Sequence, residues 1–115
     1  MFIRCAFFRG QAKPGQEAAF TAYVRDRLVP LWTQFPGADE VRVLRQEETD
    51  LPGQHYEMVL AIRYPSRAAI EDALASSVRF ESREVTKGLL EMFDGDVFHT
   101  VFRADEFPLA QEAGA

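Results

Sequence analysis

The sequence predicts a single α+β domain in which helices cover one face of an antiparallel β-sheet. At 115 residues the chain has room for one hydrophobic core. Hydrophobic residues make up 47% of it, including 10 Phe, which is typical of a packed globular domain. Segments with a period of two and segments with a helical period follow each other as strand, helix, strand, strand, helix, strand, and this order favours the α+β class.

The first half of the chain predicts a strand, a helix and an edge strand. Residues 2–9 are apolar and aromatic, and we expect this strand to stop at Gly10. From residue 16 to residue 35 apolar side chains recur every three or four positions, which predicts a helix. Pro30 within that segment predicts a kink or a second short helix. Residues 41–46 alternate weakly and predict an edge strand.

The clearest strand lies over residues 56–64, after turn chemistry at Pro52 and Gly53. Its alternation predicts one face that is wholly apolar. The next helix has a capping residue, because Ser66 directly precedes its first turn. The residues expected on the apolar face of the strand are Tyr56, Met58, Leu60 and Ile62.

A further helix is expected to stop at Asp94-Gly95, and residues 97–103 predict the last strand. The complete order is that of a ferredoxin-like βαββαβ fold, with a four-stranded antiparallel sheet and helices on one face. Residues 1–104 are expected to form this one domain. Residues 105–115 are expected to form a C-terminal tail that is partly disordered.

The second face of the predicted sheet is apolar as well, since the first strand carries Ile3, Cys5 and Phe7 on it. Leaving one Val-, Ile- or Phe-sized side chain in water forgoes about 1.5–3 kcal/mol. We therefore expect a second copy of the chain to cover this face, giving a homodimer. The alternative is a monomer whose tail folds back over the sheet through Phe107 and Leu109.

Composition argues against several classes of partner and cofactor. The net charge is −5, without the clustered positive charge that nucleic-acid binding needs. The longest stretch without a formal charge, residues 28–38, is well short of the roughly 20 residues that span a bilayer. One cysteine and two histidines at no metal-site spacing predict neither disulfide nor metal, and we expect no cofactor. A cytoplasmic protein is expected, because no signal-peptide pattern opens the chain.

Three motifs on the first helical segment carry a family resemblance: Phe20-Thr-Ala-Tyr23, Val29-Pro30-Leu31 and Phe35-Pro36-Gly37. Residues 68–76 and the run into Phe93-Asp94-Gly95 extend it. In these stretches the chain resembles the dimeric α+β barrel superfamily, in its EthD-like and antibiotic-biosynthesis-monooxygenase-like branches. EthD-like chains have an aromatic-rich first helix, a His-x-Pro-Leu step and then Pro-Gly. The resemblance covers residues 2–103 and implies a homodimer with a pocket between helices and sheet.

One departure from the EthD-like pattern bears on the chemistry. Leu28 stands where the pattern has its histidine, and leucine can neither move a proton nor hold a metal. Plant polyketide-cyclase-like relatives bring histidines into the same pocket, at positions that align with Met58 and Arg79 here. The resemblance therefore implies that the acid–base groups of these relatives are missing from this chain.

The resemblance also implies which side chains line the pocket. An aromatic lining of this kind would hold a flat, apolar or aromatic ligand. Alternatively, the same side chains fill the core, because periodicity alone would bury them. The expected lining residues, with the aligned arginine, are Phe2, Phe8, Phe20, Tyr23, Met58, Leu60 and Arg79.

Arg4 and His99 are the candidate catalytic residues. Arg4 interrupts the apolar first strand on the face that should meet the helices, where it could orient a carboxylate or enolate oxygen. Alternatively, it reaches water or pairs with a nearby acid. His99 lies within the last strand and could act as a general base, or it could be a satisfied core or interface residue.

The sequence leaves three functions open. The first is a small-molecule-binding dimeric protein of the EthD-like kind, with an apolar or aromatic ligand in its pocket. The second is a cofactor-independent monooxygenase or cyclase that uses His99 and Arg4. The third is a non-enzymatic stress-associated or interaction module whose dimer is itself the functional unit.

Overall fold

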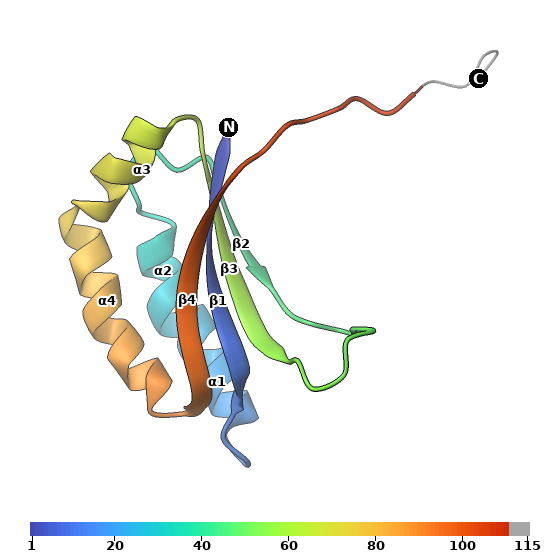
Figure 1. Cartoon of the computed structure of the whole chain (residues 1–115). Helices are drawn as coiled ribbons and strands as arrows, with labels where there is room; N and C mark the ends of the chain where they lie inside the picture. The colour runs from blue at the N-terminus through green and yellow to red at the C-terminus, as the bar shows by residue number, and fades with distance from the viewer. Residues whose placement is uncertain (111–115) are drawn as a thin grey trace.

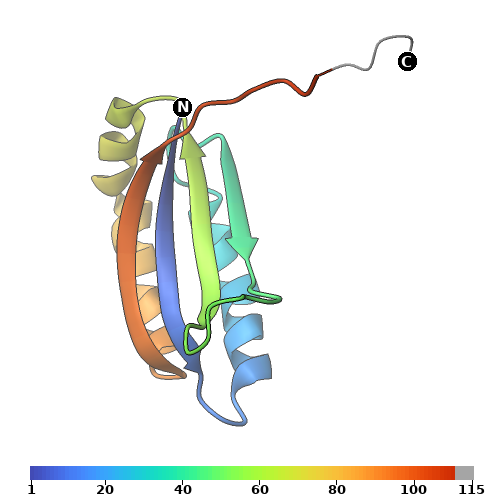
Figure 2. The same ribbon diagram turned by 45° about the vertical axis from the view of Figure 1, so that its right-hand side comes forward.

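The computed structural model describes residues 1–110 of the chain as one sheet covered on one side by helices (Figure 1). All strand pairs are antiparallel, and the strand order across the sheet is β2-β3-β1-β4 (Figure 2). This arrangement confirms the ferredoxin-like α+β fold. The strands are β1 (Phe2–Ala12), β2 (Glu40–Leu44), β3 (Tyr56–Tyr64) and β4 (Phe93–Arg103).

The helices form a single layer on the inner face of the sheet, and no helix of residues 1–110 lies on the opposite face (Figures 1 and 2). The first helical segment is interrupted, as Pro30 predicted. Val29 N–H donates to the carbonyl of Val24, five residues back, in a π-helical turn just before the proline, which has no N–H to offer. The helical elements are α1 (Glu17–Tyr23), η1 (Val24–Leu28), α2 (Val29–Trp32), α3 (Arg67–Leu74) and α4 (Ser77–Leu90).

Three local predictions agree with the structure: the bounds of the third strand, the edge position of β2 and the cap of α3. The third strand has the bounds expected from its alternation, and β2 is an edge strand that pairs only with β3. The Ser66 hydroxyl accepts a hydrogen bond from Ala69 N–H at 3.1 Å, so it caps α3. A second serine, Ser76, caps α4 in the same way.

The hydrophobic core lies between the helix layer and the inner face of the sheet. Phe8 and Met58 from the strands and Phe20 and Leu89 from the helices are each at most 2% exposed. The ring of Phe93 lies 5.9 Å from that of Phe8 and 6.0 Å from that of Phe20. Aromatic packing therefore closes the core at the end of the sheet where β4 begins.

Several predicted boundaries are wrong. The edge strand spans Glu40–Leu44 instead of residues 41–46. The first strand continues through Gly10 to Ala12, and the last strand begins at Phe93 instead of residue 97, because α4 already ends at Leu90. Gly10 and Gly95 pair directly across β1 and β4, where a Cβ on either would overlap the backbone of the facing strand. These glycines permit a close approach of two strands and do not end them.

Tyr56 lies on the opposite face from the one predicted. The register between β1 and β3 shifts between Phe8 and Arg9, so that Phe8 faces Met58 while Arg9 faces Tyr56. The extra residue in β3 is a β-bulge at Glu57, which turns Tyr56 onto the outer face. There its ring lies 5.7 Å from that of Phe7.

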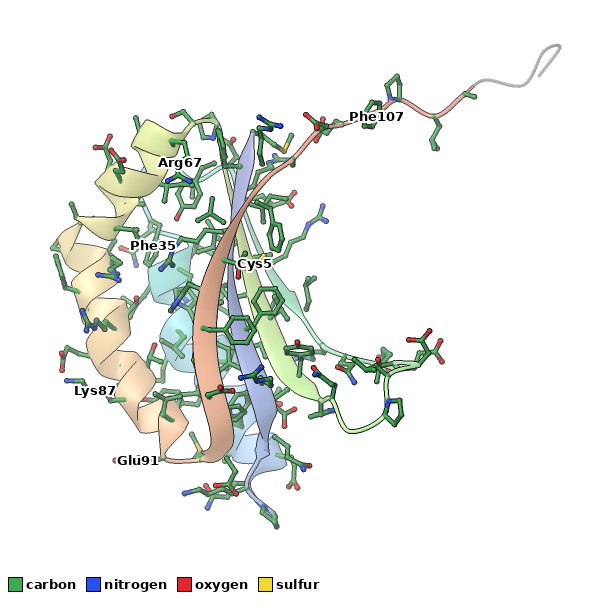
Figure 3. All side chains as sticks on the ribbon, in the orientation of Figure 1. Cys5, Phe35, Arg67, Lys87, Glu91 and Phe107 are labelled. Carbon is green, nitrogen blue, oxygen red and sulfur yellow. The ribbon has the colours of Figure 1, made fainter. Side chains whose placement is uncertain are left out.

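The outer face of the sheet is open and carries large apolar side chains beside charged ones such as Arg42 and Arg63. Phe102 and Leu44 are 48% and 47% exposed on it, and the labelled Cys5 lies on this side in Figure 3. The described part of the tail runs away from the sheet (Figures 1 and 3), with Phe107 84% exposed and Leu109 94% exposed. The tail up to residue 110 thus leaves the outer face uncovered. The part of the predicted tail over residues 111–115 lies outside the described residues.

Candidate ligand-binding cavity

A cavity of about 410 Å³ lies between the inner face of the sheet and the helices. Strands β1, β3 and β4 form its floor, and α2 and α4 form its roof. Short side chains leave this space unfilled, because Ala6 occupies the middle of β1 and Ser82 faces it from α4. The cavity opens to solvent along the β4 edge of the sheet. This follows because the exposed lining residues come from α4 and β4 and include Arg83, Lys87 and His99.

One side of the cavity is apolar and includes three aromatic rings. Trp32 and Phe35 contribute rings from the end of the first helical segment, and Figure 3 shows Phe35 between the helices and the sheet. Both side chains are buried, and so is Phe8 on the sheet. Such a wall suits the flat body of an aromatic or apolar molecule. The apolar lining residues are Ala6, Phe8, Trp32, Phe35, Leu60, Ile62, Leu90 and Val97.

The other side of the cavity is polar and basic, and most of it comes from α4. Its polar lining residues are spaced by three and four positions, so they form one stripe along the helix. The hydroxyl groups of this stripe are occupied within the helix, since Ser82 donates to the carbonyl of Arg79 and Thr86 to that of Ser82. Their protons are therefore used, and the charged groups are the donors that the stripe offers to a ligand. The polar stripe consists of Arg79, Ser82, Arg83, Thr86 and Lys87.

Arg4 contributes a cation from the floor. It lies on the inner face of β1, opposite Val101 of β4, and is partly buried. Burial lowers the pKa of Arg4, and the positive charge of Arg79 beside it lowers that pKa further. Within residues 1–110 neither Arg4 nor Arg79 forms an ion pair. Two like charges thus face one desolvated space without a carboxylate between them.

His99 lies on the same face and next to Arg4. It is paired with Ala6 of β1, one inner-face position along the strand from Arg4, so the two side chains are diagonal neighbours. The ring is reached by solvent through the mouth of the cavity. Desolvation by its surroundings lowers the pKa of His99 below its ordinary value, and the charges of Arg4 and Arg79 add to this effect. The neutral imidazole, which can accept a proton, is therefore favoured at neutral pH.

The structure places some of the expected site residues in the cavity and others in the closed core. Phe8, Leu60 and Arg79 line the cavity, together with Arg4 and His99. Four others do not. Phe20 and Met58 are fully buried in the core, and Phe2 packs against its edge. Tyr23 is held against α4, where its hydroxyl donates to the carbonyl of Val85 at 2.7 Å.

Sequence reasoning named Arg79 as a lining residue but missed the rest of the polar stripe on α4. The available signal was a run of polar positions with helical spacing next to the apolar positions of the same helix. Positions 79, 82, 83, 86 and 87 follow this spacing, beside the buried Leu89. On an ordinary surface helix such a run faces water, so the sequence alone does not reveal that it borders a cavity. Trp32 and Phe35, also in the lining, are indistinguishable by pattern from core residues.

The described residues contain no metal-binding cluster of acidic, His or Cys side chains and no helix that could cross a membrane. Within residues 1–110 no group of three or more His, Cys, Asp or Glu side chains could hold a metal ion. In the same part of the chain, no helix is both long enough and apolar enough to cross a membrane.

Solved structures share this fold at low sequence identity. An ethyl tert-butyl ether degradation (EthD) family protein from Bacillus halodurans C-125 superposes with a TM-score of 0.70 at 13% identity, over 91% of this chain and 100% of that one. A structure described as an antibiotic biosynthesis monooxygenase gives a TM-score of 0.63 at 18% identity, over 92% and 100% of the two chains. These similarities confirm the fold expected from the sequence resemblance.

A third similar structure is a mutant of SnoaB, a cofactor-independent oxygenase from Streptomyces nogalater. It has a TM-score of 0.63 at 18% identity, over 92% of this chain and 95% of that one. No family model matches the sequence, and a search of the curated proteins finds no match. At these identities the likeness concerns the fold, and the side chains of this chain have to carry any statement about function.

Proposed function

We propose that this chain binds an apolar or aromatic small molecule in the cavity between its sheet and its helices, and that it does so as a homodimer. The observation that carries the proposal is the cavity itself. Its volume of about 410 Å³ lies within the range of roughly 300–1,000 Å³ that is typical of small-molecule sites. An aromatic wall, a few polar groups and an open mouth are the features such sites combine.

The shape of the fold supports the dimer. The outer face of the sheet exposes large apolar side chains such as Phe102 and Leu44, and the described tail does not cover them. A second sheet placed face to face across a two-fold axis would bury this surface on both copies. The helix-side cavity would remain accessible in such a dimer, because it lies on the other side of the sheet. A cytoplasmic location fits the single, buried, free Cys5.

The test is ligand binding with a cavity-filling control. We expect members of a panel of aromatic acids and quinols to raise the unfolding temperature of the wild-type protein. Ala6→Leu places three more carbon atoms on the floor of the cavity, so it should abolish this effect while leaving the fold intact by circular dichroism. A panel that leaves the wild type unmoved, or an Ala6→Leu variant that responds equally, would overturn the proposal.

A second candidate function is cofactor-independent catalysis. The observation that favours it is the placement of His99 beside Arg4 in one cavity. Neutral His99 would accept a proton from an acidic hydroxyl or C–H group of an aromatic substrate, and the arginines would stabilise the oxygen anion that forms. The deprotonated quinol would then reduce oxygen, losing two electrons and two protons in total, which gives the quinone and hydrogen peroxide.

Oxygen consumption with a panel of quinols tests this second function. His99→Gln should remove turnover while binding of the same quinol persists, because glutamine keeps a hydrogen-bonding group of similar reach but cannot take the proton. His55→Gln is the control, since His55 is exposed and outside the cavity lining. Equal turnover in the wild type and in His99→Gln would eliminate the catalytic role.

A further inference from the structure

We propose that the ligand of the cavity is an organic acid, and that its carboxylate binds between Arg4 and Arg79 while its apolar body lies against the aromatic wall. This inference rests on the proposed binding function and adds the chemical class of the ligand. It assigns each of the two sides of the cavity to one part of a single molecule.

The distribution of charge is the first argument. The chain as a whole is acidic, with a net charge of −5, yet the cavity lining contains Arg4, Arg79, Arg83 and Lys87 and no Asp or Glu. A concave, partly desolvated surface of one sign concentrates ions of the opposite sign. On this protein the cavity is a basic site on an acidic molecule, and an anion is the ligand that it favours.

The pairing of arginines is the second argument. On the exposed surface, Arg9 pairs with Asp96 and Arg25 pairs with Asp26, at 2.6 Å and 2.8 Å. The cavity arginines, which lose more hydration, have no such carboxylate within residues 1–110. The guanidinium of Arg79 lies 5.6 Å from the centroid of the Phe80 ring, and this cation–π contact supplies no negative charge. A desolvated guanidinium without an anion is costly, so a bound carboxylate would relieve both charges.

The depth of the cations is the third argument. Arg4 comes from the floor and Arg79 from the roof, and both are partly buried. Arg83 and Lys87 are exposed at the mouth, and Lys87 already pairs with Glu84 at 2.8 Å. The inner pair therefore forms the binding site for the acid group, and the outer pair draws anions toward the mouth.

Calorimetric titration of matched acids and amides tests the inference. The probes are benzoate, 2-naphthoate and anthracene-2-carboxylate, each with its neutral carboxamide, at pH 7.5 and low salt. We expect at least one acid to bind about tenfold or more tightly than its amide, because the amide lacks the charge that two arginines require. Added salt should weaken the acid and leave the amide unchanged.

Three variants locate the effect. Arg4→Met and Arg79→Met should each reduce the preference for the acid about tenfold and leave amide binding unchanged. Either one suffices as a test if the other fails to fold. Arg45→Met is the control, because Arg45 is exposed and outside the cavity lining.

The outcomes separate this inference from the binding function on which it rests. Equal affinity for acids and amides, or an acid preference that survives both cavity variants, would overturn the carboxylate site while the binding function stands. If none of the six probes binds while quinols of the wider panel do, the carboxylate site alone is overturned, and if the quinols fail as well, both are overturned. A preference lost in Arg4→Met or Arg79→Met and kept in Arg45→Met supports both.

Discussion

At the scale of single residues, the cavity exists because short or polar side chains occupy positions where a core would have large apolar ones. Ala6 on β1 is followed two positions on by the buried Phe8, and on α4 Ser82 and Thr86 lie close to the fully buried Leu89. Protein interiors are normally packed without voids of this size. The short side chains at these positions therefore leave space that larger apolar side chains would fill. Arg4 likewise places a charged side chain on the inner face of β1, where a filled core would have an apolar one.

Arg4→Met should stabilise the ligand-free protein. The substitution removes a partly desolvated cation that is repelled by Arg79, and methionine keeps most of the apolar stem. We expect the free energy of unfolding, measured with urea, to rise by about 1 kcal/mol. Arg45→Met, at an exposed position, should change it little. A clear loss of stability in Arg4→Met would mean that Arg4 is held by favourable contacts in the free protein.

His99 should make stability depend on pH. Its pKa is lower in the folded chain than the ordinary value of 6.5 that applies to the unfolded chain. As pH falls below that value, the unfolded state binds the proton first, and the free energy of unfolding decreases. Desolvation of the ring is the main cause of the lowered pKa, and the charges of Arg4 from β1 and Arg79 from α4 oppose protonation further.

Urea unfolding at pH 7.5 and at pH 5.5 measures this dependence. His99→Gln should lose less stability between the two pH values than the wild type does, because glutamine does not titrate. His55→Gln should behave as the wild type, since that residue is exposed outside the cavity. Identical pH dependence in all three proteins would contradict the assigned environment of His99.

At the scale of elements, the position of α4 determines whether the cavity stays open. Gly88 of α4 lies against Tyr23 of α1, where a Cβ would overlap the tyrosine hydroxyl. That hydroxyl in turn donates to the carbonyl of Val85, also on α4. This contact fixes α4 over the sheet close to the lining residues Lys87 and Leu90.

Gly88→Ala should therefore destabilise the protein, although alanine is the better helix former. Helix propensity alone would stabilise by about 1 kcal/mol, whereas forcing an atom into an occupied space costs about 1–3 kcal/mol. We expect a net loss of about 1 kcal/mol in urea unfolding. In the background of Tyr23→Phe, which removes the overlapping oxygen, the same substitution should cost less. Stabilisation by Gly88→Ala in the wild-type background would contradict the observed packing.

The elements also show which parts of the structure are predictable from sequence. The bounds of β3 and the Ser66 cap follow from alternation and from local hydrogen bonding, and both are confirmed. The ends of β1 and β4 do not follow from local signals, because Gly10 is accommodated by its pairing with the distant Gly95. The bulge that reverses Tyr56 depends in the same way on the facing strand.

The candidate site was predictable only in part, for a related reason. Arg4 and His99 stand out in the sequence because they interrupt apolar strands, and both face the cavity. Phe20 and Met58 share the same apolar pattern as Phe8, and only the packing distinguishes a lining residue from a filled core. Periodicity reports which face of an element is buried but not whether the space beside that face is filled.

At the scale of the whole molecule, the outer face of the sheet is the feature that requires an explanation. The rings of Phe7 and Phe98 are stacked with centroids 5.0 Å apart, and the guanidinium of Arg9 lies 5.1 Å from the Phe98 centroid. Phe102 continues this apolar surface along β4 and is 48% exposed. A contiguous apolar surface of this kind is typical of an interface between subunits.

Phe102→Glu should dissociate the proposed homodimer. Two-fold symmetry doubles the effect of each substitution, and each buried Phe contributes about 1.5–3 kcal/mol. We expect light scattering to give the mass of two chains for the wild type and of one chain for the variant at the same concentration. Phe80→Glu, on the exposed side of α4, should leave the mass of two chains unchanged. A wild type with the mass of one chain would refute the dimer.

The central claim is that the cavity binds a small organic acid through its basic side, and a crystal structure with 2-naphthoate tests it most directly. We predict the naphthalene rings between Phe8 and Trp32, with a carboxylate oxygen at about 3 Å from a guanidinium nitrogen of Arg4 or Arg79. Naphthoate bound outside the cavity, or bound inside it with its carboxylate turned toward solvent and away from both arginines, would contradict the claim.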